Sequence, residues 1–318
     1  MDTRLDPDIR IFTDILRGDW RQHPPLDDLT TVEARLVAER MRERWTAGGP
    51  TMSQTRNVEI ETGVGALRLR IHRPVGVTAE GAPALIYIHG GGFVFFSLDT
   101  HDRLMREYAD AGQFVVVGVD YPLSPEAKYP VALDHIVALV GWLGEHGTQF
   151  GIDATRLVIG GDSVGANLAL ATCLRLRDTG SAITLRGILS NYGAFSGHVS
   201  DAAEAAYGGP QAILTQADMI YFFDQYLVSA DQCDDPYACP LSARDVSGLP
   251  PVLLLIPELD VLAEQSFKLE DRLKAAGCAV MHEFYPGATH SFLEAMSIAP
   301  LALKAIRDGA LWIRTRLI

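Results

Sequence analysis

The residues whose types and spacing most clearly indicate catalysis are Gly161, Ser163 and Gly165, which form a G-x-S-x-G pattern. The pattern ends a short apolar run, Leu157–Gly161, and opens an Ala- and Leu-rich segment typical of a helix. A serine at such a sharp strand-to-helix turn is exposed for nucleophilic attack, and the helix N-terminus favours developing negative charge. A purely structural glycine-rich turn is the alternative, whereas no G-x-G-x-x-G pattern of a dinucleotide site can be written here.

Three consecutive glycines, Gly90, Gly91 and Gly92, directly follow another apolar run. Their backbone N–H groups could surround the oxyanion of a tetrahedral intermediate, where each donor contributes roughly 3 kcal/mol at the transition state. We expect Gly91 and Gly92 to be donors together with the N–H of Val164, and Gly90 to support the loop. His89 is expected to hold this loop by hydrogen bonds, with simple packing as the alternative.

A serine nucleophile of this kind needs an acid and a histidine, in the order Ser, Asp, His along the chain. Asp260 follows the apolar run Val252–Pro257, and His290 follows the run Ala279–Tyr285. Both are therefore expected at the sheet edge that also carries Ser163. His290 would take the serine proton, while Asp260 would orient the imidazole and stabilise its charged form.

Other ionisable residues offer alternatives to these assignments. Glu258 and Glu264 flank the predicted acid, and each could be a surface carboxylate or the acid itself. His282 lies inside a predicted strand and is expected to be packed or solvated. The remaining histidines form no H-E-x-x-H pattern, so we expect neither a metal site nor a cofactor.

The elements that must position these residues alternate along the chain from about residue 83. Short apolar runs rich in β-branched residues suit strands that are buried on both faces, and the segments between them suit crossover helices. This pattern predicts an α/β architecture, with a mostly parallel central sheet flanked by helices and covered by a helical cap. The expected strands lie at 84–89, 114–120, 157–161, 185–190, 252–257 and 279–285, after a hairpin at 57–61 and 66–72.

Two further segments have helical periodicity. Residues 215–227 form one of them, and residues 31–45 form the other. The second segment is expected to bury a stripe made of Val32, Leu36, Val37, Met41 and Trp45.

These elements predict four parts of the chain. Residues 1–50 are expected to be an N-terminal helical cap segment, and residues 51–192 the first part of the core. Residues 193–248 interrupt the strand–helix rhythm and are expected to be a cap insertion. Residues 249–318 would complete the core.

Composition excludes several function classes. The 318 residues carry 27 Lys and Arg against 40 Asp and Glu, a net charge of −13, which argues against nucleic acid and anionic membranes as partners. The four cysteines form no C-x-x-C pair, and 48% of the residues are hydrophobic, as in an ordinary globular protein. The segment Met1–Asp8 has early acidic residues and no apolar run, so we expect no signal peptide and a cytoplasmic location.

The motifs at 89–93, 161–165, 260–262 and 287–290 together resemble those of the hormone-sensitive-lipase-like family of α/β-hydrolase esterases. The resemblance implies cofactor-free hydrolysis of short-chain acyl esters, acetyl to butyryl, with a small-molecule ester as the partner; it leaves a homodimer open. Further segments are similar to those of the acetyl esterases in that family, at Leu98–Arg103, Asp120–Glu126, Arg175–Asp178, Leu214–Gln216 and Asp308–Ala310.

Four residues depart from the family pattern and put the substrate range, not the reaction type, in doubt. They are Val164, Ser291, Pro122 and Phe96. We expect Phe93 and Phe96 to border the substrate pocket, although Phe96 could instead point into the core of the cap. Amides, lactones or carbonates are alternative substrates, and a small-molecule binding protein without catalysis is the alternative from another class.

Overall fold

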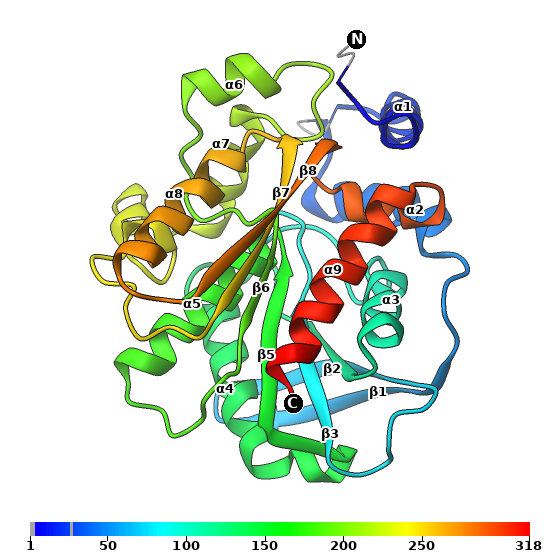
Figure 1. The fold of residues 1–318 in the computed structure, drawn as a ribbon. Helices are drawn as coiled ribbons and strands as arrows, with labels where there is room; N and C mark the ends of the chain where they lie inside the picture. The colour runs from blue at the N-terminus through cyan, green and yellow to red at the C-terminus, as the bar shows by residue number, and fades with distance from the viewer. Residues whose placement is uncertain (1–3, 26–27) are drawn as a thin grey trace.

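A computed structural model of the protein describes residues 4–25 and 28–318 (Figure 1). Residues 1–3 and 26–27, which fall within the expected N-terminal cap segment, lie outside these described residues. One eight-stranded sheet forms the centre, in the order β1-β2-β4-β3-β5-β6-β7-β8. Its strands are β1 (Met52–Thr62), β2 (Gly65–Pro74), β3 (Ala82–Ile88), β4 (Val115–Asp120), β5 (Ile152–Asp162), β6 (Ile188–Asn191), β7 (Val252–Leu259) and β8 (Val280–Thr289).

The sheet is mostly parallel, as the sequence predicts. Strand β2 pairs antiparallel with both β1 and β4, and every other neighbouring pair is parallel. The hairpin β1–β2 turns between Thr62 and Gly65, at the position expected from its alternating segments. Each expected apolar run overlaps a strand, and the predicted α/β architecture with a mostly parallel sheet is confirmed.

Helices cover both faces of the sheet (Figure 1). Helices α3 (Asp102–Gly112) and α9 (Pro300–Arg316) pack together on one face, and the other face carries α4 (Val131–His146), α5 (Val164–Asp178) and α8 (Ala263–Ala275). Because β3 to β8 run parallel, their carboxyl ends meet at one edge of the sheet, where ligand sites form in such folds.

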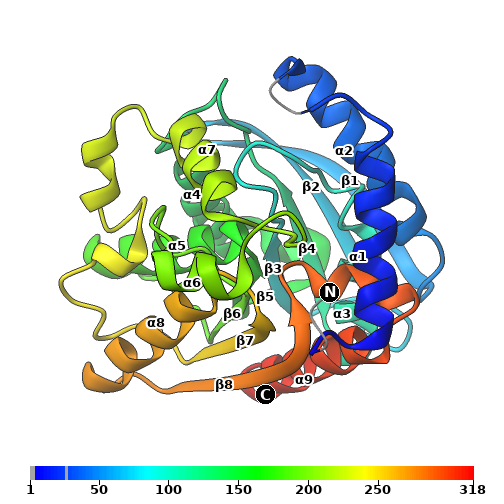
Figure 2. The same cartoon turned by 90° about the horizontal axis from the view of Figure 1, so that it is seen from above.

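Four helices lie above that edge and are called the cap here. They are α1 (Pro7–Trp20), α2 (Thr31–Thr46), α6 (Asp201–Tyr207) and α7 (Gln216–Tyr226). Seen from above, α1 and α2 run along one side of the molecule, and α6 and α7 lie on the other side (Figure 2). The cap therefore combines the start of the chain with a segment from its middle.

The buried face of α2 differs from the expected stripe. Val37, Met41 and Trp45 are buried as expected. Val32 and Leu36 are instead exposed, at 61% and 53%, and Ala34 and Ala38 are buried. These two alanines pack against Val94 and Phe95 just beyond the glycine loop. Small residues allow this close approach, so the helix is rotated relative to the face that hydrophobicity alone predicts.

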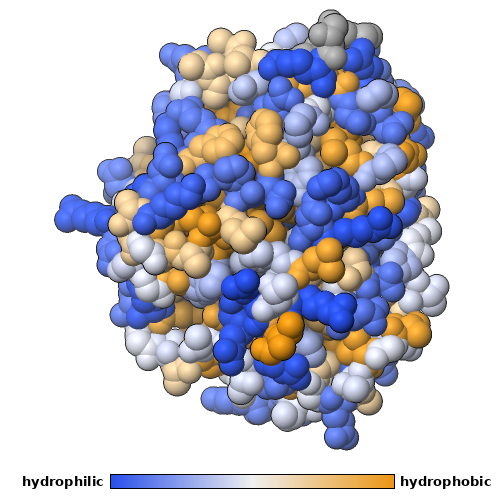
Figure 3. Space-filling view, in the orientation of Figure 1, coloured by the Kyte–Doolittle hydropathy of each residue, from blue (hydrophilic) through white to orange (hydrophobic). Residues whose placement is uncertain are grey.

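The surface has a mixed character. On the face drawn in Figure 3, hydrophobic residues are interspersed with hydrophilic ones. Among the described residues, no helix is both long enough and apolar enough to cross a bilayer.

Candidate active site

Ser163 occupies the turn between β5 and α5 in a strained conformation, with φ 54° and ψ −119°. The turn passes close to β3, because a Cβ added at Gly161 or Gly165 would lie 2.1 or 2.0 Å from the carbonyl oxygen of Ile88. Neither position can carry a side chain without moving the backbone. A hydrogen bond from the Ser163 N–H to the Asn191 carbonyl, 2.9 Å long, fixes the turn to β6.

The structure brings Ser163, His290 and Asp260 together. The distance from His290 Nε2 to Ser163 Oγ is 3.1 Å, and the distance from His290 Nδ1 to Asp260 Oδ2 is 2.8 Å. All three side chains are buried, and the N–H of Leu262 donates to the second oxygen of Asp260 at 2.9 Å. Such an arrangement can activate a serine hydroxyl as a nucleophile for acyl transfer.

The alternative residues lie elsewhere. Glu258 accepts a hydrogen bond from the N–H of Gly287 at 2.8 Å and so supports the loop before His290 from outside. Glu264 forms an ion pair with a lysine one turn along α8. His282 lies 2.8 Å from Glu270, away from the serine, which fits the expectation of a packed or solvated residue.

The glycine loop lies beside the serine. Gly91 and Gly92 have φ values of 109° and 63°, and both line the same cavity as Ser163. A Cβ at Gly91 would lie 2.2 Å from the carbonyl oxygen of Phe95, and one at Gly92 would lie 2.2 Å from the Phe222 ring of the cap. Val164 begins α5, so its N–H has no acceptor within the helix and is available to a bound group.

One buried carboxylate joins the serine turn to the glycine loop. Asp162 Oδ1 accepts hydrogen bonds from the Gly90 N–H at 3.1 Å and the Tyr87 hydroxyl at 2.9 Å, and Oδ2 lies 3.3 Å from His101 Nε2. Burial alone would raise the pKa of Asp162, but the neighbouring His101 and the Tyr87 hydroxyl outweigh burial and lower it. The N–H of Gly90 already donates to Asp162, so Gly90 supports the loop and does not donate to a bound oxyanion.

His89 lies beneath the loop. Its Nδ1 donates to the Gly90 carbonyl at 2.7 Å, and its ring stacks on Tyr121 with 4.4 Å between the centroids. The Tyr121 hydroxyl donates back to the His89 carbonyl at 3.0 Å. Burial, with a contribution from His101, lowers the pKa of His89 to about 3, so the ring is neutral.

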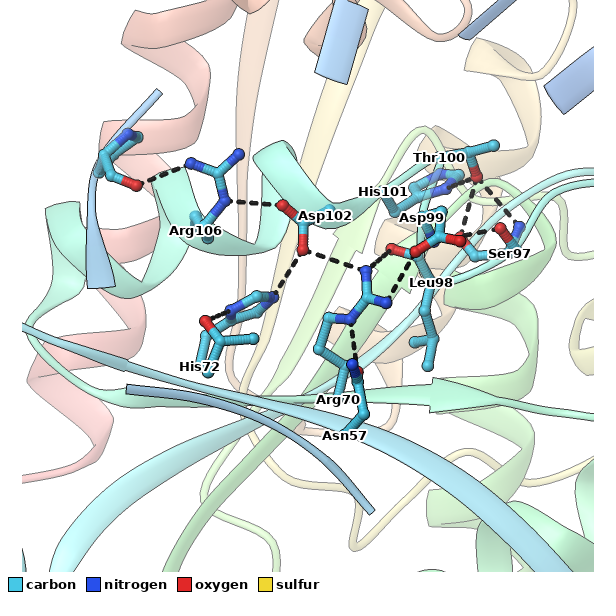
Figure 4. A network of polar contacts seen from close by, with 12 residues as sticks. Asn57, Arg70, His72, Ser97, Leu98, Asp99, Thr100, His101, Asp102 and Arg106 are labelled. Carbon is cyan, nitrogen blue, oxygen red and sulfur yellow. Dashed lines mark hydrogen bonds and ion pairs between the residues drawn. The ribbon is translucent and has the colours of Figure 1, made fainter. Parts of the chain in front are cut away.

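A polar network anchors the segment that follows the loop to β2 (Figure 4). Asp102 accepts hydrogen bonds from Arg70 at 3.1 Å and Arg106 at 2.7 Å, and it lies 3.3 Å from His72 Nε2. Burial alone would raise the pKa of Asp102, but the hydrogen bonds from His72 and Arg106 outweigh burial and hold it below its usual range. The residue before Asp102 is His101, so the network also fixes the ring that faces Asp162.

A cavity of about 310 Å³ opens above Ser163 and His290. Phe96 lines it, but Phe93 does not, contrary to the expectation from the sequence. The Phe93 ring is buried and stacks on Tyr226 with 3.7 Å between centroids. A phenylalanine at this position fills the space between the loop and α7, so it supports the cap from below.

Several cavity residues were not predicted from the sequence. They come from the cap and from the 3-10 helix η5 (Phe292–Ser297), and they include Trp20, Met41, Arg42, Met219, Phe222 and Glu294. No local motif marks them, because each reaches the cavity only through the packing of the cap on the core.

One group of side chains has the chemistry of metal ligands. His101, Asp162 and Glu294 offer ligand atoms within 4.8 Å of one another. Each of these atoms is already engaged, since His101 faces Asp162 and Arg42 forms an ion pair with Glu294. The guanidinium supplies the positive charge that a cation would otherwise bring.

Comparisons with known proteins agree with this fold. A family model described as an α/β hydrolase fold matches residues 85–294. An acetyl esterase from Salmonella agona strain SL483 is 31% identical over 319 aligned residues, covering 99% of this chain and 96% of the relative.

Solved structures are also similar. An ester hydrolase from the metagenome of Lake Arreo, solved with a bipyridine phosphonate derivative, has a TM-score of 0.91 at 31% identity, with 98% of each chain covered. A thermostable esterase from Pseudomonas putida has a TM-score of 0.92 at 28% identity, covering 100% of this chain and 99% of the other. The chain therefore belongs to the hormone-sensitive-lipase-like family of α/β-hydrolases.

Proposed function

We propose that the protein is a serine carboxylesterase that hydrolyses short-chain acyl esters, acetyl to butyryl, through an acyl-enzyme on Ser163. The observation that carries this proposal is the hydrogen-bonded series Ser163–His290–Asp260, with distances of 3.1 and 2.8 Å. The printed names of similar proteins, acetyl esterase and esterase, support the same reaction class.

In this mechanism, Ser163 Oγ attacks the ester carbonyl while His290 Nε2 takes its proton. The N–H groups of Gly91, Gly92 and Val164 stabilise the oxyanion of the tetrahedral intermediate. His290 then returns the proton to the leaving alcohol, and the acyl group stays on the serine. Water, activated by the same histidine, releases the acid and restores the enzyme, while Asp260 orients the ring throughout.

The cavity wall supports a preference for short chains. Phe96 borders the cavity and is only partly buried, and Val164 adds a branched side chain beside Ser163. Because each methylene accepted or rejected by a pocket changes kcat/KM by roughly 10-fold or more, esters with acyl groups of two to four carbons should react best. Turnover should fall sharply for acyl groups longer than about six carbons.

Two measurements test the proposal. A fluorophosphonate probe should label the protein once, and mass spectrometry should map the adduct to Ser163. A series of p-nitrophenyl esters with acyl groups from acetyl to dodecanoyl should show the short-chain optimum. Labelling of another serine would refute the assignment of Ser163 as the nucleophile. Absence of turnover across the whole series would refute the esterase assignment and favour a binding protein.

A further inference from the structure

Phe96 reaches the cavity through an unusual backbone conformation. Its φ is 75°, in the left-handed region that few residues other than glycine adopt. The ring lies against the glycine loop, since a Cβ added at Gly91 would be 2.8 Å from Phe96 Cδ2. A ring in this position narrows the cavity while contacts beyond the loop keep it there, one with His101, at 5.8 Å between the centroids, and a second with the cap.

Arg42 of α2 provides that second contact. Its guanidinium carbon is 4.3 Å from the centroid of the Phe96 ring, and the side chain is buried. Attraction between a cation and an aromatic face strengthens when both are removed from water. Burial lowers the pKa of Arg42 to about 10, which still leaves the group charged at neutral pH.

Glu294 of η5 completes the arrangement. It is buried, forms an ion pair with Arg42 and lines the same cavity. A buried guanidinium without a partner would be strongly unfavourable, so the carboxylate is what allows Arg42 to remain there. The three side chains thus come from a cap helix, the segment after the glycine loop and the helix that follows His290.

We propose that Arg42 is a positioning residue that holds the Phe96 ring against the glycine loop and thereby sets the length of chain the cavity accepts, with Glu294 as its counter-charge. The inference rests on the proposed esterase function. It assigns size selection to a contact between the cap and the core, instead of to the shape of the Phe96 side chain alone.

The alternative is that the ion pair only attaches α2 to the core. Removal of the pair would then lower the melting temperature without changing substrate preference. Replacing Arg42 by lysine separates the two roles. The ammonium keeps the ion pair that would attach α2, but only the planar guanidinium can stack on an aromatic ring over its whole face.

The experiment compares the double variant Arg42→Met/Glu294→Gln, the conservative variant Arg42→Lys and the control Arg44→Met. Arg44 lies on the same helix, is exposed and pairs at 3.6 Å with Asp19. The kcat/KM values are measured for p-nitrophenyl esters with acyl groups of two to eight carbons, and for acetates of alcohols of increasing length. Thermal melts accompany every variant.

In the double variant, the ratio of long-chain to short-chain kcat/KM should rise about tenfold in one of the two series, because the freed ring can turn aside. Arg42→Lys keeps the charge and should raise the ratio about threefold, and it keeps the test valid if the double variant does not fold. Arg44→Met should leave the ratio unchanged. Ratios equal to wild type in folded Arg42 variants would overturn the inference, whereas a wild-type protein without ester turnover would overturn the proposed function instead.

Discussion

The loops at the carboxyl edge of the sheet and the cap above them are held in different ways. Ser163 is fixed by the backbone hydrogen bond to Asn191, and the Asp260 carboxylate is fixed by the N–H of Leu262. The cap is attached largely through side chains, both buried hydrophobic ones and long polar ones. Arg35 of α2, for example, donates to the Val94 carbonyl at 2.8 Å and pairs with Glu126 at 2.7 Å.

This difference indicates that the catalytic rate and the preference among substrates can be changed separately in this molecule. Backbone hydrogen bonds and close glycine contacts leave the reacting groups little freedom, so changes there should alter the rate of every substrate. Side-chain contacts such as those of Arg35 can be changed one at a time, so changes in the cap should alter preferences among substrates. The following predictions test that separation, beginning with the loops.

The largest effect is expected for Ser163→Ala. Without the nucleophile, kcat should fall by ~10⁴ or more, leaving only oxyanion stabilisation and binding. The loss should be the same for acetyl and butyryl esters, because the serine serves every substrate. A loss that depends strongly on acyl length would break the separation between the loops and the cap.

Asp260→Asn should come next, with a loss of up to ~10⁴ in kcat, because an amide favours the wrong histidine tautomer. Circular dichroism should show an unchanged fold. The matched control is Glu258→Gln, two residues away, which should stay near wild type since Glu258 only supports the loop through Gly287. If the control were the damaging change, Glu258 would be the acid.

The loops should also make the free energy of unfolding depend on pH in acid, through His89. His89 has a folded-state pKa of about 3, below its ordinary value, so the unfolded chain takes up a proton first as the pH falls. Above about pH 6.5 His89 is neutral in both states and does not lower the free energy of unfolding. Below that pH the free energy of unfolding should fall by up to ~1.4 kcal/mol per pH unit.

Urea unfolding of His89→Phe at pH 7, 5.5 and 4.5 tests this sign. The variant keeps a ring against Tyr121 but cannot titrate, so its stability should depend less on pH than that of wild type. His146→Gln, at the half-exposed end of α4, is the control and should keep the wild-type dependence. Equal slopes for wild type and His89→Phe would show that the acid sensitivity arises elsewhere.

The smallest effect on acetate turnover is expected for Phe96→Gly. The substitution removes the ring from the cavity wall, so the acyl or alcohol optimum should lengthen by about two carbons, with acetate turnover changed less than about threefold. Glycine also relieves the left-handed backbone at this position, which costs other residues roughly 1–2 kcal/mol. A lowered melting temperature with an unchanged chain-length profile would place the ring in the cap's core instead.

The sequence predicts the loops far better than the cap, for a physical reason. Ser163, Asp260 and His290 each follow a strand directly, and a parallel sheet brings strand ends together whatever the helices do. The contacts of α2 depend on how the helix is rotated. Hydrophobicity alone predicts the burial of Met41 correctly but also predicts burial of Leu36, which is exposed.

The placement of Phe93 and Phe96 also could not be predicted from the sequence. They lie three residues apart in one loop, yet one stacks under the cap and the other borders the cavity. Both have a positive φ, 65° and 75°, so the backbone region does not separate them. Their different placement follows from ring contacts made by α7 and α2, segments distant in the sequence. Periodicity within a short segment carries no information on such contacts.

The ion pair between Arg42 and Glu294 has a consequence for how the protein is made. A ribosome produces α2 well before η5, so the nascent cap helix carries a charge whose partner does not yet exist. The wall of the cavity can close only after η5 has emerged. Chains cut short before residue 294 would lack that closure even with Ser163 and Asp260 in place, so synthesis through η5 is a condition for a finished pocket.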